Sequence, residues 1–98
     1  MHNVFLYDNK LDLGIGQFAS VGGFKLISAG RNECPEAIRE DSDKIYGYIY
    51  EIKDDILDML DMYYGLGVDL HKRISAKAAL EGGVIVDIQM YEYNMELV

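Results

Sequence analysis

The chain has 98 residues, which is enough for one small domain with a single core and too few for two, so we expect one domain over residues 1–98. Half of the residues are apolar (50%) and 27% are charged, a composition that favours a folded globular chain over a disordered one. The formal net charge of -8 argues against partners that are nucleic acids or anionic membranes, because both are bound through clustered Lys and Arg.

The first third of the chain predicts short strands separated by loops. Residues 4–7 are apolar and aromatic and indicate a buried strand, which stops where residues 8–10 supply turn-forming side chains. Glycines are frequent between residues 14 and 23 and disfavour a long helix, so this part is predicted to be loop. Residues 24–28 predict a second strand, followed by a turn at residues 30–32.

The middle of the chain carries the most regular pattern, an aromatic strand that leads into an acidic helix. The chain is expected to be extended around Pro35 and to form a polar connection over residues 40–44. Residues 45–52 alternate, so that their three tyrosines lie on one face of the predicted strand. Asp54 or Asp55 is expected to cap the next helix, whose apolar stripe continues to the region of Gly65.

Two strands are predicted in the last third of the chain, over residues 73–80 and 84–93. The intervening Glu81-Gly82-Gly83 is typical of a hairpin turn, because two successive glycines accept the backbone angles that tight turns require.

Six short segments, taken in order, resemble those of the gamma-glutamylcyclotransferase-like family. The family has a first strand leading into a Tyr-Gly-Ser/Thr-Leu loop, a Gly-aromatic-x-Leu strand and an extended Pro-Ala segment. A Gly-x-x-Tyr strand, a Leu-Asp-x-x-Glu-Gly helix end and a Tyr-x-Arg strand follow. The corresponding segments here are Tyr7-Asp8-Asn9-Lys10, Gly23-Phe24-Lys25-Leu26, Pro35-Glu36-Ala37-Ile38, Gly47-Tyr48-Ile49-Tyr50, Leu60-Asp61-Met62-Tyr63-Tyr64-Gly65 and His71-Lys72-Arg73. Their order is more specific than any one of them.

The resemblance implies an α+β fold, with a small, strongly curved, mostly antiparallel sheet or open barrel and one main helix. It also implies a pocket between the loop after the first strand, the helix end and the strand that contains Tyr48. We therefore expect a small polar ligand to be bound by the residues of this pocket. They are Tyr7, Asp8, Asn9, Lys10, Tyr48, Tyr64 and Arg73.

The resemblance also assigns a reaction, and this chain departs from it. In family enzymes the helix-end glutamate acts as general acid/base while the substrate's amine attacks its own side-chain carbonyl and gives 5-oxoproline. Tyr64 stands at that position here, and an ordinary tyrosine with a pKa near ~10 is almost wholly protonated at neutral pH. Asp8 stands where the family has a glycine that lets backbone approach the substrate. We expect a non-catalytic protein that binds a small polar ligand or a protein partner, with no catalytic residue assigned.

Two alternatives remain open. The chain could be an active gamma-glutamylcyclotransferase that uses Asp61 or Asp69 as a substitute acid. It could also be an acidic interaction protein that captures a basic partner, although plain solubility is the simpler explanation of its charge. The sequence leaves the oligomeric state open.

Other signals give no site. The segment from Gly14 to Ala19 fits the G-x-G-x-x-G/A dinucleotide pattern, but later glycines interrupt the helix that this motif must open, so no cofactor is expected. His2 and His71 lack partners at ligand spacing, and no metal site is expected. Cys34 is the single cysteine, which excludes an internal disulfide and favours a cytoplasmic location.

Overall fold

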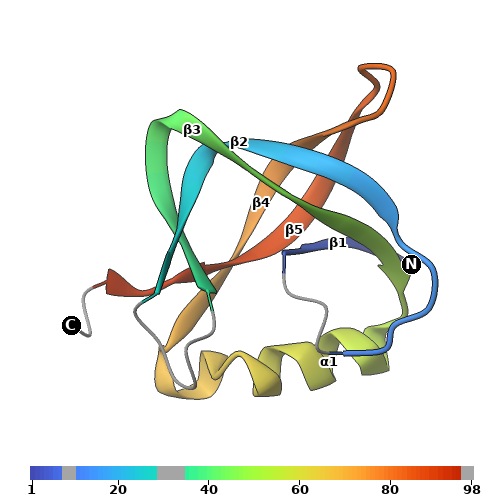
Figure 1. Ribbon diagram of the computed structural model, residues 1–98. Helices are drawn as coiled ribbons and strands as arrows, with labels where there is room; N and C mark the ends of the chain where they lie inside the picture. The colour runs from blue at the N-terminus through green and yellow to red at the C-terminus, as the bar shows by residue number, and fades with distance from the viewer. Residues whose placement is uncertain (8–10, 29–34, 96–98) are drawn as a thin grey trace.

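The protein is a closed β-barrel with one α-helix on its outside (Figure 1). The computed structural model describes residues 1–7, 11–28 and 35–95, and these form five strands in the order β1-β3-β2-β4-β5. The elements are β1 (His2–Leu6), β2 (Gln17–Ser28), β3 (Pro35–Ile52), α1 (Asp54–Tyr63), the 3-10 helix η2 (Leu66–Val68), β4 (His71–Leu80) and β5 (Ile85–Tyr93). Strand pairs are antiparallel except β1 with β5, which is parallel. The predicted α+β fold, mostly antiparallel and with one main helix, is confirmed, and the barrel is closed.

Residues of β3 alternate between two cores, as the strand periodicity predicted. Ile45 and Ile49 point into the barrel, where they belong to a cluster with Phe5 of β1 and Met90 of β5. Tyr50 belongs to a second cluster on the outside of the barrel, which the helix covers. The three tyrosines of β3 therefore share the outer face, but α1 does not bury all of them, since Tyr46 is 54% exposed and Tyr50 only 9%.

The helix α1 packs against the barrel through one apolar side. Leu57 and Leu60 are buried in the outer cluster, as expected for an amphipathic helix. The predicted cap, Asp54 or Asp55, is wrong, because Lys53 is the N-cap residue and its side chain makes no capping hydrogen bond. Asp54 and Asp55 lie in the first turn, where their negative charge complements the helix dipole. Within the described residues, no helix is long and apolar enough to cross a membrane.

Two segments predicted to lack strand structure belong to strands. Residues 17–23, predicted as loop, form the first part of β2, and residues 40–44, predicted as a polar connection, lie within β3. The pairing of β2 with β3 is interrupted between Gly22 and Phe24, where Gly22 lies opposite Lys44 and Phe24 opposite Arg39. Residues 40–43 therefore form an irregular bulge, and their polarity reflects solvent exposure within a strand.

The turn residues behave as predicted where the structure describes them. Leu80 and Val84 close the β4–β5 hairpin through a 2.8 Å hydrogen bond, and Gly82 and Gly83 both have φ of 86°. Gly65 follows the helix in the left-handed conformation, with φ of 71°. The turns predicted at residues 8–10 and 30–32 lie outside the described residues.

Gly47 permits the close approach of β1 and β3. A Cβ atom at this position would lie 2.4 Å from the backbone oxygen of Leu6 and 2.9 Å from the Phe5 ring. We expect Gly47→Ala to lower the free energy of unfolding by about 2 kcal/mol, because backbone cannot move aside as a flexible side chain can. Urea unfolding measures the loss, and Gly22→Ala is the matched control, since its Cβ would meet nothing within 4 Å. Equal stability of the two variants would contradict this account of barrel closure.

Candidate functional site

The ring of Tyr64 fills the space between the helix end and the barrel. Tyr64 is 6% exposed and stacks on Tyr91 of β5, with ring centroids 4.2 Å apart and an interplanar angle of 13°. The ring centroids of Tyr64 and His71 are 5.1 Å apart, and the two rings are nearly perpendicular, with an interplanar angle of 80°. A tyrosine in this setting is a core side chain, because it is buried and contacts other aromatic rings.

A buried contact between a histidine and a glutamate lies beside this aromatic cluster. Nε2 of His71 is 2.6 Å from Oε2 of Glu36, and the two side chains are 1% and 9% exposed. Nδ1 of His71 is 2.7 Å from the backbone oxygen of Tyr64, and since a carbonyl oxygen only accepts, Nδ1 carries the hydrogen. Nε2 of His71 and Oε2 of Glu36 are close enough for an ion pair, but they do not have the alignment of a hydrogen bond.

Sequence reasoning missed this pair. The sequence places Glu36 in the extended Pro35 segment and His71 at the start of a strand, and neither position has a pattern that predicts burial. The position of Glu36 between Pro35 and Ala37 is only a weak signal of burial. Which face of the strand Glu36 occupies follows from the pairing of β3, which the sequence alone does not give. His71 begins β4 close to the helix end, and its contact with Glu36 joins β4 to the start of β3.

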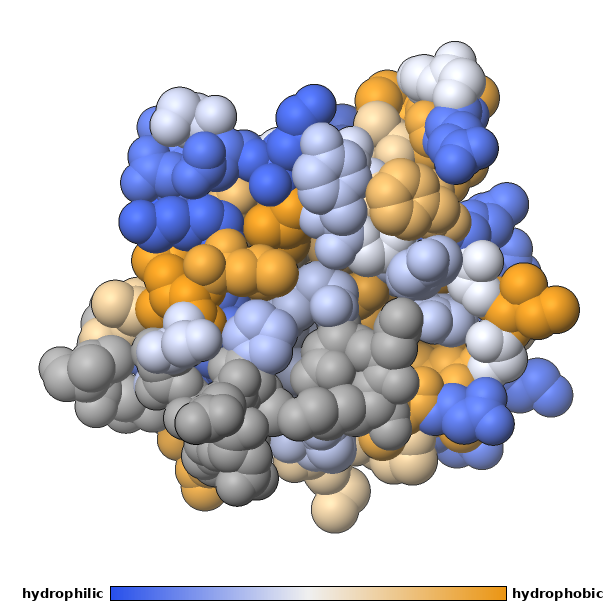
Figure 2. All heavy atoms as spheres, in the orientation of Figure 1, coloured by the Kyte–Doolittle hydropathy of each residue, from blue (hydrophilic) through white to orange (hydrophobic). Residues whose placement is uncertain are grey.

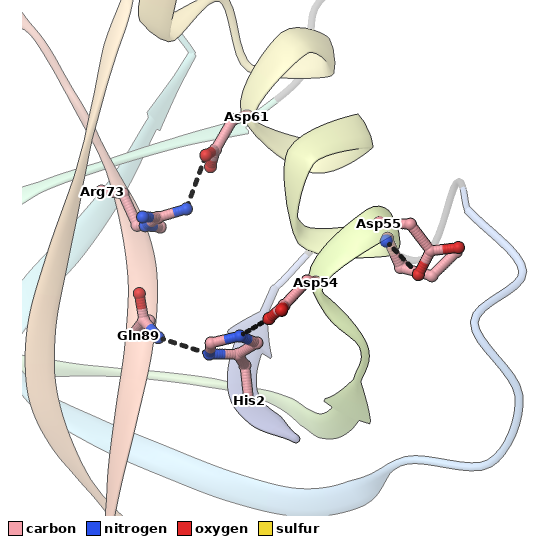
Figure 3. Close-up of polar contacts among 7 residues, drawn as sticks. His2, Asp54, Asp55, Asp61, Arg73 and Gln89 are labelled. Atoms are coloured by element: carbon pink, nitrogen blue, oxygen red, sulfur yellow. Dashed lines mark hydrogen bonds and ion pairs between the residues drawn. The ribbon is translucent and has the colours of Figure 1, made fainter.

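Asp61 ties the helix to β4 and β5, and Figure 3 shows its contact with Arg73 of β4. Its carboxylate accepts a hydrogen bond from the Arg73 guanidinium at 2.5 Å and another from the Tyr91 hydroxyl at 2.7 Å. Burial, and then the adjacent carboxylate, raise the pKa of Tyr91 well above its ordinary value, so this phenol remains a proton donor at neutral pH. With both oxygens engaged, Asp61 holds the structure together at this place.

The predicted ligand residues lie in several environments. Tyr64 and Arg73 are joined through Tyr91 and Asp61, as described above. Tyr7 packs against the interior cluster, and its hydroxyl accepts a 3.2 Å hydrogen bond from the Ala37 amide.

Tyr48 packs against the outer cluster, and its ring centroid is 5.7 Å from the ring centroid of Phe18. The predicted ligand residues Asp8, Asn9 and Lys10 lie outside the described residues. The ligand-binding role of all of these residues stays a prediction.

A groove in another part of the molecule contains none of these residues. It has a volume of about 540 Å³, and Figure 3 shows two of its residues, His2 and Gln89, with Asp54 beside them. Its lining consists of Met1, His2, Asn3, Ser75, Ala76, Asp87, Ile88 and Gln89. The hydrogen bond with His2 lowers the pKa of Asp54, which keeps that carboxylate charged. In the described part of the chain, no cluster of three or more His, Cys, Asp or Glu could hold a metal ion.

The raised pKa of Tyr91 makes stability fall at alkaline pH. An unfolded tyrosine ionises near pH ~10, whereas Tyr91 in the fold keeps its proton at higher pH. This contribution is complete below pH ~10 and is lost as the pH rises further, because only the unfolded chain then releases the proton. We expect Tyr91→Phe to show a shallower loss of unfolding free energy in urea titrations from about pH 8 to 11. Identical slopes for both proteins would contradict the assignment.

Three solved structures with similar folds place the barrel among known proteins. An Arabidopsis thaliana protein matches with a TM-score of 0.80 and 19% identity, over 97% of this chain and 70% of its own. An AIG2-like protein from Mus musculus matches with a TM-score of 0.73 and 21% identity, over 98% and 81%. A structure named gamma-glutamyl cyclotransferase matches with a TM-score of 0.67 and 18% identity, over 94% and 54%. At these identities the likeness concerns the fold, and the chain spans about half of the last protein.

The sequence itself also matches a family. A search of curated proteins finds no match. The model of the family described as gamma-glutamyl cyclotransferase, AIG2-like, covers residues 4–97, which is nearly the whole chain. The family resemblance expected from the ordered segments is therefore confirmed, and the chain belongs to the gamma-glutamyl cyclotransferase, AIG2-like family.

Proposed function

We propose that this chain is a non-catalytic member of its family that binds another molecule, a protein partner in preference to a small polar ligand. The burial of Tyr64 carries the proposal. Its ring is stacked on Tyr91 and occupies the space beside the helix end, so this position offers neither a proton acceptor nor room for a substrate. The proposal keeps the cytoplasmic location expected from the single cysteine.

The groups around Tyr64 also support the proposal that the chain does not catalyse the cyclotransferase reaction. Ring closure needs a group that takes a proton from an ammonium and returns one to the leaving amine. Tyr91 has a raised pKa and stays protonated, and Asp61 is held by two hydrogen bonds. Asp69, the other predicted substitute acid, is an exposed residue with a left-handed backbone beyond η2.

The small-ligand form of the proposal has less support. The described residues of the interior cluster are between 0% and 5% exposed, so this part of the barrel is closely packed. A protein partner, by contrast, can contact the outer surface over a large area.

The direct test is release of 5-oxoproline from gamma-glutamyl peptides. We expect none above the uncatalysed background, because the proton acceptor is missing at the helix end. Chromatographic detection of 5-oxoproline measures the outcome, with an active family enzyme as the positive control and Tyr64→Phe as the matched variant. Turnover by the purified chain that disappears on heat unfolding would overturn the proposal.

One observation favours the competing function, an active cyclotransferase. Glu36 is a buried carboxylate next to the Tyr64 cluster, and its His71 partner could relay a proton. Burial can prepare a carboxyl for acid/base work, although buried ion pairs more commonly serve structure. Glu36 would then take the place that the resemblance gives to the family's glutamate.

Substituting Glu36 separates the two functions. If the contact is structural, Glu36→Gln lowers the free energy of unfolding by about 2 kcal/mol, because it weakens the buried contact with the imidazole of His71. Urea unfolding gives that number, and Glu51→Gln, an exposed residue of the same strand, is the control. If the chain proves active, loss of turnover in a folded Glu36→Gln protein, with Glu51→Gln unaffected, assigns the acid to Glu36.

A further inference from the structure

The helix α1 carries a second apolar stripe, which the barrel does not cover. Met59 is 43% exposed, Met62 81% and Tyr63 42%. Residues three and four positions apart are neighbours on a helix surface, so Met59 lies beside both Met62 and Tyr63. Figure 2 shows orange surface along the lower edge of the molecule, where α1 runs in Figure 1. We call Met59, Met62 and Tyr63 the outer stripe of α1.

The side chains of the outer stripe suit contact with another molecule. A methionine side chain is flexible and polarisable, which lets it fit apolar surfaces of different shapes. The ring of Tyr63 meets the buried ring of Tyr64 edge-on, with centroids 5.1 Å apart and an interplanar angle of 82°. A partner that covers Tyr63 therefore meets a ring that is already ordered. Adjacent exposed apolar side chains mark interaction sites more often than single scattered ones do.

The four aspartates of α1 fall into two sets. Asp54 and Asp61 bond to side chains of the barrel (Figure 3). Asp55 and Asp58 are exposed, and in the described part of the chain neither belongs to a salt bridge. The helix itself has no basic residue. Two carboxylates on α1 are therefore left without a cation to balance them.

Helix geometry places these two carboxylates beside the outer stripe. Asp55 precedes Met59 by four residues, and Asp58 precedes Met62 by four, so each aspartate lies one turn from a methionine on the same side of α1. Neighbours at this spacing have Cβ atoms about 5–6 Å apart. One side of a single helix thus presents apolar side chains and negative charge within reach of the same partner.

The charge and the backbone of α1 select among possible occupants. A second copy would bring the same aspartates against this helix, and the net charge of -8 opposes its approach. An extended peptide is held largely by backbone hydrogen bonds to a sheet edge, whereas the backbone groups of a helix bond within it. A partner helix packs through side chains alone, and its basic residues can pair with carboxylates beside the contact.

We propose that the outer stripe of α1 docks a helix of another protein whose apolar stripe is flanked by Lys or Arg. This rests on the non-catalytic binding role proposed above and names the class of partner. The apolar side chains of the partner cover Met59, Met62 and Tyr63, and its basic side chains pair with Asp55 and Asp58.

The test uses a fluorescent peptide of about eighteen Leu and Lys residues, long enough to form a helix, with its leucines on one side. Anisotropy measures its affinity for the intact chain. We expect binding that weakens as salt is raised, because basic side chains contribute to it. A peptide of the same composition with its leucines spread around the helix, and one with Glu in place of every Lys, should bind far more weakly.

Two matched pairs of variants separate docking on α1 from general attraction. Met62→Ser should weaken binding about fivefold through lost apolar contact, and Asp58→Asn about twofold through a lost charge pair. Val84→Ser and Glu81→Gln are the controls, since both residues are exposed in the β4–β5 hairpin, which lies at the opposite end of the molecule from α1 (Figure 1). Circular dichroism confirms that all four variants are folded.

Several results would overturn the proposal. Absence of peptide binding, equal binding of the three peptides, or equal affinity of Met62→Ser and Val84→Ser would each do so. Equal losses for Asp58→Asn and Glu81→Gln would reduce the attraction to net charge and overturn it too. Self-association that Met62→Ser abolishes, detected by sedimentation, would assign the outer stripe to a second copy instead.

The outcome is separable from the proposed function. A chain that binds no basic peptide and releases no 5-oxoproline loses this docking site and keeps its non-catalytic role. A chain that releases 5-oxoproline loses the proposed function, whatever the peptide does.

Discussion

The stack of Tyr64 on Tyr91 fixes the end of the helix to the barrel, and the other groups at this end are arranged around it. Because Tyr64 lies flat on β5, its backbone oxygen faces β4 and accepts the Nδ1 hydrogen of His71. That bond orients the imidazole so that Nε2 meets Glu36. On the other side of the stack, the Tyr91 hydroxyl reaches Asp61 and orders its carboxylate for Arg73. The aromatic stack therefore lies between the buried contact of His71 with Glu36 and the partly exposed ion pair of Asp61 with Arg73.

Sequence reasoning recovered the elements better than their limits. The β4–β5 hairpin and the alternation of residues 45–52 were predictable, because strand periodicity and paired glycines are local properties. Residues 17–23 and 40–44 were misassigned for a shared reason: glycines and charges in them reflect a bulge and an exposed strand face, and both depend on pairing between distant segments. The predicted cap, Asp54 or Asp55, lies one or two residues after the observed one, a difference that is common at helix ends.

The candidate site was less predictable than the fold. The segment order led to Tyr64 and Arg73, and these do meet one network through Tyr91 and Asp61. Glu36 and His71 could not be found in the same way, because their buried contact joins two strands, β3 and β4, that a sequence pattern does not place side by side. Asp61 is the opposite case. Its charge suggests a role as a catalytic acid, whereas its two hydrogen bonds give it a structural role.

The packed interior and the exposed outer rings reflect one distribution of apolar side chains. The described inward side chains of the barrel are between 0% and 5% exposed and contribute to its stability. On the outside, α1 covers the cluster around Tyr50 and leaves Phe18 and Tyr46 open to solvent. Exposed rings cost solubility, and the high negative charge of the chain offsets that cost by opposing self-association.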